Sequence, residues 1–491
     1  MQSAFRDQAL VSVVIPCHNG VDDTRQAIRS LLAQESAPPL EIVIVDNGGS
    51  DATRDLGREF PGVQVLRSEQ NLGFAGGVNR GIAAARGEQV LVLNNDTAAA
   101  PRMLARLAAA LASDPRIAMA APVSNHVKGT ARLPIGGLGA TAAGRQEIEA
   151  ALGAAGPGRI EDVDTLAGLC LLFPRALLQQ IGGAFDERFG LGNFEDDDFC
   201  LRARLAGRRL VLVRDAFLHH EGHKTFHALQ VDYKQLFAEK AALFRAKWQG
   251  VAAAQALFAR ADGDFARASL CAEMGLAEHP NWPDGHWILA LQRLQQNLPA
   301  AAIAHLQRFL ALCPAHGEAA VTLALQTLRL GDEATGTRLF ADALERCHLE
   351  EEFAARSLAA FSRWLLDQKR PEEAAAHLRT ASAIAPQNAE IENLLGVALM
   401  DAGALAEAVA ALQAAEARGS RNSTKNLGIC LWRQHRHDEA LRVMARAVAQ
   451  DPTDPGARSN LDSALRALRA QGIVVADDLL AQLAVRDPGR G

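Results

Sequence analysis

The longest run of acidic residues in the sequence is a group of four adjacent carboxylates that could carry out acid–base chemistry. Glu195, Asp196, Asp197 and Asp198 stand directly before FCLRARLAG, a segment with the pattern of a helix. Adjacent carboxylates repel one another, which raises their pKa values unless a metal ion, an arginine or a helix N-terminus compensates. Such a run can cap a helix, and it can also supply the base that takes a proton from an attacking hydroxyl group. The residue types alone leave both interpretations open.

Two further aspartates stand where predicted strands end. Asp46 closes the run EIVIVD, and Asp96 follows VLVLNN. Between them, residues 71–81 (NLGFAGGVNRG) form a glycine-rich loop that runs into a helix. Ligands of open parallel sheets bind beyond the carboxyl ends of the strands, and a helix that starts after such a loop favours an anion such as a diphosphate. Ordinary helix caps and turns are the alternative for a lone strand-end aspartate and for a glycine-rich loop.

The elements that must hold these side chains alternate between strands and helices over the first 250 residues. Short β-branched runs predict strands at 11–15, 41–45, 63–67 and 89–93, and helical periodicity marks 23–34, 52–60 and 77–85. This alternation indicates right-handed βαβ units and a mostly parallel sheet. The first part of the chain is therefore predicted to be a Rossmann-like α/β domain over residues 1–250.

The rest of the chain repeats a helical pattern. Predicted helix ends recur at steps of 34, 34, 38, 34 and 32 residues, and a small residue stands twelve positions before each of them. A period near 34 with small residues at the helix crossings is typical of the tetratricopeptide repeat. We therefore predict an all-α solenoid of about six repeats and a capping helix over 251–475, followed by a tail at 476–491. The small residues are Ala268, Ala302, Gly336, Ala374, Ala408 and Ala440.

Composition and charge narrow the class of protein. A formal net charge of −6 and a pI near 6.2 argue against a protein that binds nucleic acid through phosphate contacts. The seven cysteines are scattered and never in CxxC spacing, so they predict neither a disulfide framework nor a zinc site. No stretch approaches the apolar length of a membrane span, and we expect a cytoplasmic protein without a transmembrane segment.

The order of the motifs resembles that of the family 2 inverting glycosyltransferases of the GT-A fold. The matching segments are VSVVIPCHNG, EIVIVDNGGSDAT, NLGFAGGVNRG, LVLNNDTAAAP, GLCLLFPRALLQQIGG and FDERFGLGNFEDDDFCLRARLAG. The final segment, HHEGHKTFHALQVDYKQLFAEKAALFRAKW, resembles a subgroup whose catalytic domain closes with a His-x-Gly-x-x-Thr-Phe motif and a Lys-Trp helix. The resemblance covers about residues 10–248. It departs from the family at Cys17-His18, at Ala184 and at Asn94-Asn95-Asp96, which replaces a fuller acidic motif.

The resemblance implies a binding site for a nucleotide-sugar donor. Asp46 would hydrogen-bond the nucleotide base, with Pro16 and His18 on either side of it, and Asn94 would contact the ribose or a metal-bound water. Ordinary capping is the alternative for Asn94 and Asn79. The full set of implied donor-binding residues is Pro16, His18, Asn19, Asp46, Asn47, Gly73, Phe74, Gly76, Asn79, Asn94 and Asn95.

The resemblance also implies a divalent metal ion, Mn²⁺ or Mg²⁺, on the donor diphosphate. A diphosphate leaving group develops negative charge, which a cation held by few carboxylates and by the phosphates can neutralise. Asp96 and His220 would be its protein ligands. His219 is the fallback for His220, and Lys224 would either add positive charge near the phosphates or be solvated.

The family pattern implies that Asp196 is the catalytic base. Direct displacement at the anomeric carbon requires a carboxylate that accepts the proton of the acceptor hydroxyl. Glu195 and Asp198 would support Asp196 by orienting the acceptor and anchoring Arg202. Asp197 is the least suited of the four to act directly.

The resemblance implies an enzyme that transfers a hexose from a UDP-, dTDP- or GDP-linked donor to an acceptor hydroxyl with inversion. The appended repeats favour a polypeptide acceptor, such as a Ser or Thr of a bacterial surface or flagellar protein. Two alternatives stay open: transfer to a lipid-linked glycan in polysaccharide or O-antigen synthesis, and a non-catalytic repeat scaffold with a degenerate transferase module. The repeats could also serve to form a homo-oligomer.

Overall fold

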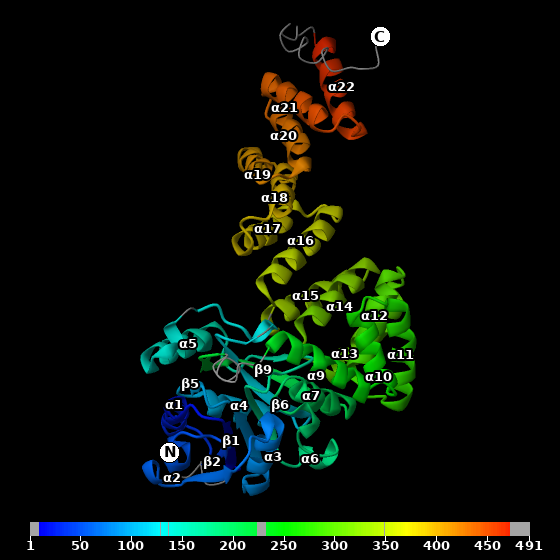
Figure 1. Cartoon of the computed structure of the whole chain (residues 1–491). Helices are drawn as coiled ribbons and strands as arrows, with labels where there is room; N and C mark the ends of the chain where they lie inside the picture. The colour runs from blue at the N-terminus through cyan, green and yellow to red at the C-terminus, as the bar shows by residue number, and fades with distance from the viewer. Residues whose placement is uncertain (1–8, 128, 136, 223–231, 348, 472–491) are drawn as a thin grey trace. The chain divides into compact units, whose positions relative to one another are not determined.

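The chain folds into two compact units, Met1–His348 and Leu349–Gly491. The computed structural model describes residues 9–127, 129–135, 137–222, 232–347 and 349–471 (Figure 1). Strands occur in the first unit, where β9 is the last strand, and from α10 onwards the described chain is helical. The predicted fold class, an α/β domain followed by a run of helices, is confirmed. The predicted tail at 476–491 lies outside the described residues.

A nine-stranded sheet forms the centre of the first unit, with the order β3-β2-β1-β4-β8-β6-β9-β5 and β7 paired to β9. Strands β1 to β4 are parallel neighbours, as predicted. The antiparallel pairs β4–β8, β6–β8, β5–β9 and β7–β9 make the other half of the sheet mixed. The bounds are β1 Val11–Cys17, β2 Leu40–Asn47, β3 Val63–Ser68, β4 Gln89–Leu93, β5 Thr97–Ala99, β6 Ile117–Ser124, β7 Ile160–Asp162, β8 Cys170–Pro174 and β9 Arg209–His220.

Helices cover both faces of the sheet, and this double burial explains why the central strands are almost wholly apolar. Alternate residues of a strand point to opposite faces, so Val13 packs in the core beneath α1 and α4, while Val14 packs in the core beneath α3 and α7. Ile28 and Leu107 belong to the first core, and Phe199 to the second. The bounds are α1 Val21–Leu32, α2 Leu56–Glu59, α3 Gly73–Ala84, α4 Met103–Ser113, α5 Ala142–Ala155, α6 Leu177–Gln180, α7 Glu195–Leu205 and α9 Tyr233–Lys247.

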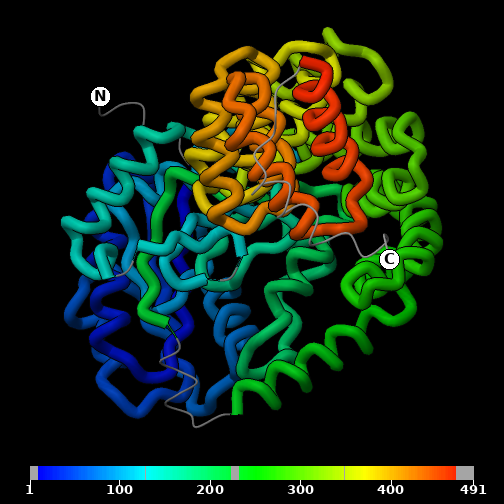
Figure 2. The backbone as a smooth tube through the Cα atoms, turned by 90° about the horizontal axis from the view of Figure 1, so that it is seen from above, coloured from blue at the N-terminus to red at the C-terminus, as the bar shows by residue number. Residues whose placement is uncertain are grey.

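Six helices that follow α9 belong to the same compact unit as the sheet. They are α10 Ala252–Ala261, α11 Phe265–Glu278, α12 Pro283–Gln295, α13 Pro299–Leu312, α14 Gly317–Arg329 and α15 Glu333–Arg346. Figure 2 shows them, in green, beside the α/β part. The chain therefore changes from mixed α/β structure to helices near residue 250, whereas the boundary between the two compact units lies about 100 residues later, at residue 348.

The second unit consists of helices throughout its described part. They are α16 Glu351–Asp367, α17 Pro371–Ile384, α18 Ala389–Asp401, α19 Leu405–Ala417, α20 Arg421–Arg433, α21 His437–Gln450 and α22 Pro455–Ala470. All six small residues predicted to lie at helix crossings are buried across the two units. A Cβ on Gly336 would approach Leu328 Cγ to 2.5 Å, so only glycine allows this crossing of α14 and α15. Among the described helices, no segment has the length and apolar character that crossing a bilayer demands.

Candidate active site

Asp46 lies at the carboxyl end of β2, fully buried, and its carboxylate is already hydrogen-bonded. Its Oδ1 accepts a hydrogen bond from the Gly49 amide at 3.0 Å, and its Oδ2 lies 2.5 Å from the Arg67 guanidinium. Arg67 also donates to the Gly49 carbonyl at 2.6 Å. Asp46 therefore shapes the turn after β2, and its contact with a nucleotide base stays a prediction.

Asn47 clamps the glycine-rich loop to the end of β2. Its Oδ1 accepts a hydrogen bond from the Leu72 amide at 2.9 Å, and its Nδ2 donates to the Gly73 carbonyl at 2.9 Å. His18, from the end of β1, lies with Nδ1 2.9 Å from the Asn47 carbonyl oxygen. The ends of β1 and β2 and the start of α3 are thus joined through one asparagine.

Asn19 and Asn95 connect three of the loops at the carboxyl edge of the sheet. The Asn19 side-chain oxygen accepts from the backbone amides of Ser50 and Asp51, at 2.7 and 3.2 Å. Asn95 Nδ2 donates to the Asn19 carbonyl at 3.2 Å and to Thr24 Oγ1 at 3.1 Å. Both residues therefore organise the loops, and direct contact with a donor stays a prediction for each.

The start of α3 lies against the loop that precedes the acidic helix. The Phe74 amide donates to the Gly190 carbonyl at 3.0 Å. Further along α3, Asn79 exchanges hydrogen bonds with the backbone of Phe185, at 2.8 and 3.0 Å, and donates to Glu187 at 2.9 Å. Asn79 therefore holds the 185–187 segment on α3, a role that sequence reasoning missed. Pro16 lies beside the same helix, because a Cβ on Gly77 would come within 3.2 Å of the Pro16 Cβ. Gly76 lies close to Leu72, since a Cβ on Gly76 would come within 2.9 Å of the Leu72 Cβ.

Replacing Gly73 by alanine is expected to destabilise the first unit. Gly73 has φ +74°, and a Cβ there would lie 2.0 Å from the Gly190 carbonyl oxygen. Gly62 also has a positive φ, +100°, but a Cβ there would meet no atom within 4 Å. We expect Gly73→Ala to lower the free energy of unfolding by about 1–3 kcal/mol more than Gly62→Ala, because only the first adds steric overlap to backbone strain. Urea denaturation measures both; equal losses would contradict the close approach.

Asp96 and His220 meet where β5 pairs with β9. His220 lies opposite Thr97 in this pairing, and its Nε2 is 3.3 Å from Asp96 Oδ1. Its Nδ1 lies 2.7 Å from the His126 carbonyl oxygen, which can only accept, so Nδ1 carries the hydrogen and Nε2 faces the carboxylate. Burial acts to lower the pKa of His220, but the hydrogen bond and charge of Asp96 outweigh burial and raise it.

This arrangement fits a divalent cation bound between Asp96 and His220. A metal-binding histidine commonly donates a hydrogen bond from its other ring N–H to a carbonyl oxygen, and His220 makes such a bond to His126. No group of three His, Cys, Asp or Glu side chains suited to a metal occurs within the described ranges. Two protein ligands suit Mn²⁺ or Mg²⁺ shared with donor phosphates. His219 points to the other face of β9, where its Nε2 lies 3.2 Å from Glu221, and Lys224 lies outside the described residues.

Asp196 lies in the first turn of α7, partly exposed, beside the start of the glycine-rich helix. Its Oδ2 accepts a hydrogen bond from the Gly168 amide at 2.7 Å, and its Oδ1 accepts from the Asp197 amide at 3.0 Å. A Cβ on Gly168 would come within 3.5 Å of both Asp196 and Phe74. Leu169, the next residue, accepts a hydrogen bond from the Asn94 amide at 3.0 Å. Residues 168–169 therefore connect the predicted base with the segment that carries Asp96.

The other three acids of the run have different surroundings. Glu195 is buried, and burial together with the Asp196 charge raises its pKa well above the ordinary value, which favours its neutral form. Asp197 accepts a hydrogen bond from Thr165 at 3.2 Å. Asp198 is fully buried and contacts Arg202 at 2.9 Å, which is the predicted contact. The four adjacent carboxylates therefore do not form one equivalent cluster.

Asp198 also joins α7 to the end of α9. Lys247 Nζ lies 2.5 Å from Asp198 Oδ1, and the Trp248 indole donates to the same oxygen at 3.0 Å. Lys247 also pairs with Asp186 at 2.7 Å. The Lys-Trp end of α9 therefore anchors the acidic helix, a contact that the sequence analysis did not predict.

Backbone strain marks the entry into α7. Asn193 and Phe194 both have positive φ values, 73° and 69°, which are unfavourable for side-chain-bearing residues. The Phe194 ring stacks on Phe244 of α9 at a centroid distance of 5.5 Å, and Tyr233 donates to Asn193 at 3.0 Å. Contacts from α9 therefore hold the turn that orients Asp196.

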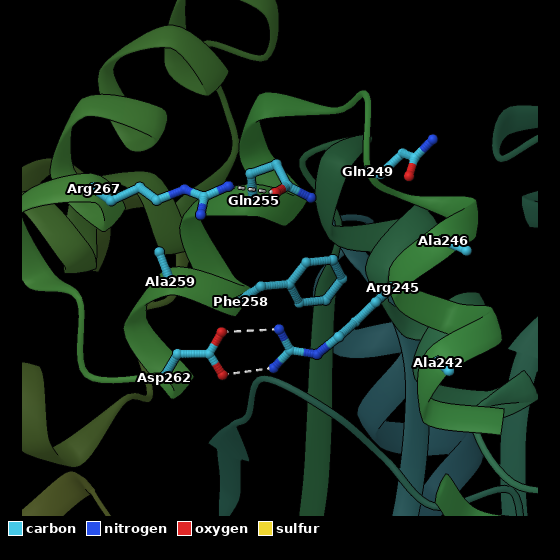
Figure 3. Close-up of a pocket in the computed structure, with 9 residues that line it drawn as sticks. All are labelled: Ala242, Arg245, Ala246, Gln249, Gln255, Phe258, Ala259, Asp262 and Arg267. Atoms are coloured by element: carbon cyan, nitrogen blue, oxygen red, sulfur yellow. Dashed lines mark hydrogen bonds and ion pairs between the residues drawn. The ribbon is translucent and has the colours of Figure 1, made fainter. Parts of the chain in front are cut away.

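A separate hollow of about 470 Å³ lies where the end of α9 meets α10 and α11 (Figure 3). Arg245 and Asp262 pair across it through two contacts, at 2.8 and 2.9 Å, and Phe258 lies under the guanidinium. Its lining contains none of the predicted site residues.

Comparison with known proteins identifies the class. The family model Glycosyl transferase family 2 matches residues 12–148, and two Tetratricopeptide repeat models match residues 365–423 and 419–455. An N-acetylglucosaminyl-diphospho-decaprenol L-rhamnosyltransferase of Mycobacterium tuberculosis is 31% identical over 223 residues, which are 38% of this chain and 68% of that protein. The chain belongs to glycosyl transferase family 2, and it carries tetratricopeptide repeats after the transferase part.

Other similarities are more limited. The uncharacterized protein y4gI of Sinorhizobium fredii is 25% identical over 252 residues, which are 49% of this chain but only 28% of that protein. A crystal structure of GalNAc-T7 with UDP, GalNAc and Mn²⁺ shares 17% identity over 43% of each chain, with a TM-score of 0.34, which supports no conclusion.

Proposed function

We propose that the protein transfers a sugar from a nucleotide-sugar donor to an acceptor hydroxyl with inversion, and that Asp196 is the catalytic base. The observation that carries this proposal is the position of the Asp196 carboxylate. It is partly exposed, fixed by two backbone amides and adjacent to the start of the glycine-rich helix. Residues 168–169 join Asp196 to the segment that carries Asp96, so a donor whose diphosphate is held at Asp96 would bring its anomeric carbon toward Asp196. The enzyme class follows from the family; the donor and the base are proposals.

The reaction needs one proton acceptor and one stabilised leaving group. The acceptor hydroxyl gives its proton to Asp196 as its oxygen forms a bond to the anomeric carbon, and the bond to the nucleoside diphosphate breaks on the opposite side. Burial and the Asp196 charge raise the pKa of Glu195, which favours its neutral form, and a neutral Glu195 adds less negative charge next to Asp196 than an ionised one would. Asp198 and Arg202 keep α7 in place during the step.

Asp96 and His220 would hold a divalent ion, Mn²⁺ or Mg²⁺, on the donor diphosphate. The ion supplies charge neutralisation for the departing diphosphate when it is bound. The Nδ1–H of His220 is hydrogen-bonded to the His126 carbonyl, so the His220 Nε2 and the Asp96 carboxylate are the groups that would hold the ion.

We further propose that the acceptor is a polypeptide and that the repeats of the second unit bind it, with a Ser or Thr hydroxyl as the nucleophile. Extended helical repeats provide concave surfaces suited to peptide segments. The second unit is compact on its own, and the two tetratricopeptide repeat models match residues within it.

A chain that ends at His348 tests the acceptor proposal. It is expected to bind and slowly hydrolyse the nucleotide sugar like the full chain, yet to transfer sugar to the polypeptide acceptor at least about tenfold more slowly, because the affinity from the repeats is lost. Circular dichroism verifies folding first. A cut near Gly250 would be a poor test, because it would remove α12, whose Asp284 pairs with Arg204 of α7. Equal transfer rates by the folded truncated chain would refute acceptor binding by the repeats.

A lipid-linked glycan is the second candidate acceptor. The similarity to a rhamnosyltransferase whose name specifies an N-acetylglucosaminyl-diphospho-decaprenol favours it. Transfer to a polyprenyl-diphosphate sugar, with equal rates for the full chain and for the chain ending at His348, would support this candidate over a polypeptide.

A further inference from the structure

The acidic helix α7 is joined at its C-terminal end to helix α12 of the same unit by a buried ion pair. Arg204, near the end of α7, is 2% exposed, and Asp284, at the start of α12, is 1% exposed. The guanidinium meets the carboxylate through two contacts, Nε to Oδ2 at 2.8 Å and Nη2 to Oδ1 at 2.5 Å. Its Nη1 donates to the Val163 carbonyl at 2.9 Å. This bidentate geometry fixes the direction of the Arg204 side chain as well as its distance.

Asp284 is itself held rigidly. Its Oδ2 accepts a hydrogen bond from the Trp282 indole at 2.8 Å, and Trp282 is fully buried in an apolar cluster that includes Ala256, Ala272 and Ile288. Burial acts to lower the pKa of Arg204, but the charges of Asp284 and of the nearby Asp164 outweigh burial and raise it, so Arg204 stays charged. A buried charge of this kind requires its partner, because removal of either one leaves an uncompensated ion.

Apolar contacts also pack the C-terminal half of α7 against helices of the same unit. Leu201 packs in a cluster with Ala254 of α10 and Trp248, and Leu205 lies against this cluster and against the Trp282 cluster. Asn281 packs against Gly207, two residues after the end of α7. A Cβ on Gly207 would lie 3.0 Å from the Asn281 Cβ. Helices α10 and α12 therefore form the surface on which the C-terminal half of α7 rests.

Further contacts join the sheet to the later helices of the same unit. Asp162 of β7 forms a bidentate pair with Arg209, at 2.8 and 2.9 Å, and its Oδ2 also accepts from the Ala315 amide at 2.7 Å. Arg116 donates to the Ala311 carbonyl at 2.7 Å, and Arg159 donates to the Glu345 carbonyl at 3.1 Å. The helices α10–α15 are thus part of the body that carries the active site.

We infer that Asp284, on helix α12 outside the sheet, is a positioning residue for the transferase reaction because it fixes α7 through Arg204. Arg204 is eight positions after Asp196 on this helix, which is about 12 Å along its axis at 1.5 Å per residue. Rotation or sliding of α7 at Arg204 is therefore carried directly to the Asp196 carboxylate. A misplacement of about 1 Å at a reacting group can reduce a rate by about 10²-fold. The inference rests on the proposed role of Asp196 as the base.

The test compares Asp284→Asn with Asp262→Asn in the full chain. Both variants remove the charge from a bidentate aspartate–arginine pair, but Asp262 pairs with Arg245 on the exposed side of α9 and α10 (Figure 3). Turnover is counted per nucleotide-binding site, so loss of folded protein does not affect it. We expect Asp284→Asn to reduce turnover about tenfold or more with donor affinity within about twofold, and Asp262→Asn to change neither. Faster hydrogen exchange of the α7 amides should accompany the loss.

A second variant covers the case in which Asp284→Asn does not fold. Arg204→Met combined with Asp284→Leu removes both buried charges, and such apolar replacements are often neutral for stability. We expect this variant to fold and to bind donor, yet to turn over about tenfold more slowly, because the directional contacts of α7 are gone. Parent turnover per site in either folded variant would overturn the inference and leave the pair a purely stabilising role. Full activity of Asp196→Asn would instead refute the proposed base. Hydrogen exchange of the α7 amides in Asp284→Asn would then still decide whether Asp284 fixes that helix.

Discussion

Replacement of Asp196 by asparagine is expected to reduce turnover by about 10²–10⁴-fold, the usual contribution of a general base, while the affinity for the nucleotide sugar stays within a few-fold. The asparagine has nearly the same size, and its single carbonyl oxygen can keep one of the two backbone hydrogen bonds, from Gly168 or from Asp197. It cannot take up a proton at neutral pH. Steady-state turnover and donor binding by calorimetry separate the two effects.

The neighbouring residue provides the matched control. Asp197→Asn makes the same carboxylate-to-amide change one position later on α7, where the Asp197 carboxylate accepts a hydrogen bond from Thr165. We expect its turnover to remain within about threefold of the parent, in the range of a surface substitution. An active Asp196→Asn together with an inactive Glu195→Gln would transfer the role of base to Glu195. The anomeric configuration of the product, read by NMR, should be inverted in every active variant.

The central strands and the order of the site segments could be predicted from the sequence, because both depend on local patterns. Val13 and Val14 belong to a continuous β-branched run that only a strand buried on both faces explains. Asp46 closes such a run, and Asp96 comes three residues after another, so positions at the carboxyl ends of strands could be assigned to both. The antiparallel pairing of β8 with β4 was not predictable in the same way, because it joins segments about 80 residues apart through a long connection.

The individual roles of the site residues depended on contacts that no local pattern contains. The resemblance predicts that Asn79 lines a donor cleft, and the structure adds that its side chain hydrogen-bonds the Phe185 backbone 106 positions away. Asp196 and Asp198 are of the same residue type, and in the sequence only the resemblance separates their roles; in the structure Asp196 is partly exposed and Asp198 is buried against Lys247. Asp284 lies in a segment that the helical period assigns to the repeats, and only the structure joins it to Arg204. Long-range pairing, rather than residue type, separates these roles.

Replacement of Asp96 by alanine is expected to abolish measurable transfer, a loss of about 10³-fold or more. Several kcal/mol of stabilisation of the departing diphosphate depend on the ion that Asp96 would hold, and each 1.36 kcal/mol corresponds to a tenfold change in rate. Asp96 is 8% exposed, and its Oδ1 faces His220 Nε2 at 3.3 Å, so alanine also leaves the imidazole without its carboxylate partner. Transfer assays in added Mn²⁺ and titration of Mn²⁺ with nucleotide present measure the two consequences.

Two adjacent histidines supply the control for the metal assignment. His220→Asn removes the Nε2 that faces Asp96, whereas His219→Asn changes a side chain on the opposite face of β9, where it contacts Glu221. We expect His220→Asn to weaken Mn²⁺ binding about 10-fold to 100-fold and His219→Asn to leave it within about twofold. A chelator should inactivate the parent, and Mn²⁺ should restore the parent but not Asp96→Ala. Full activity of the parent in chelator would refute the metal site while leaving the family and the fold unaffected, because a fold does not by itself determine how a site performs its chemistry.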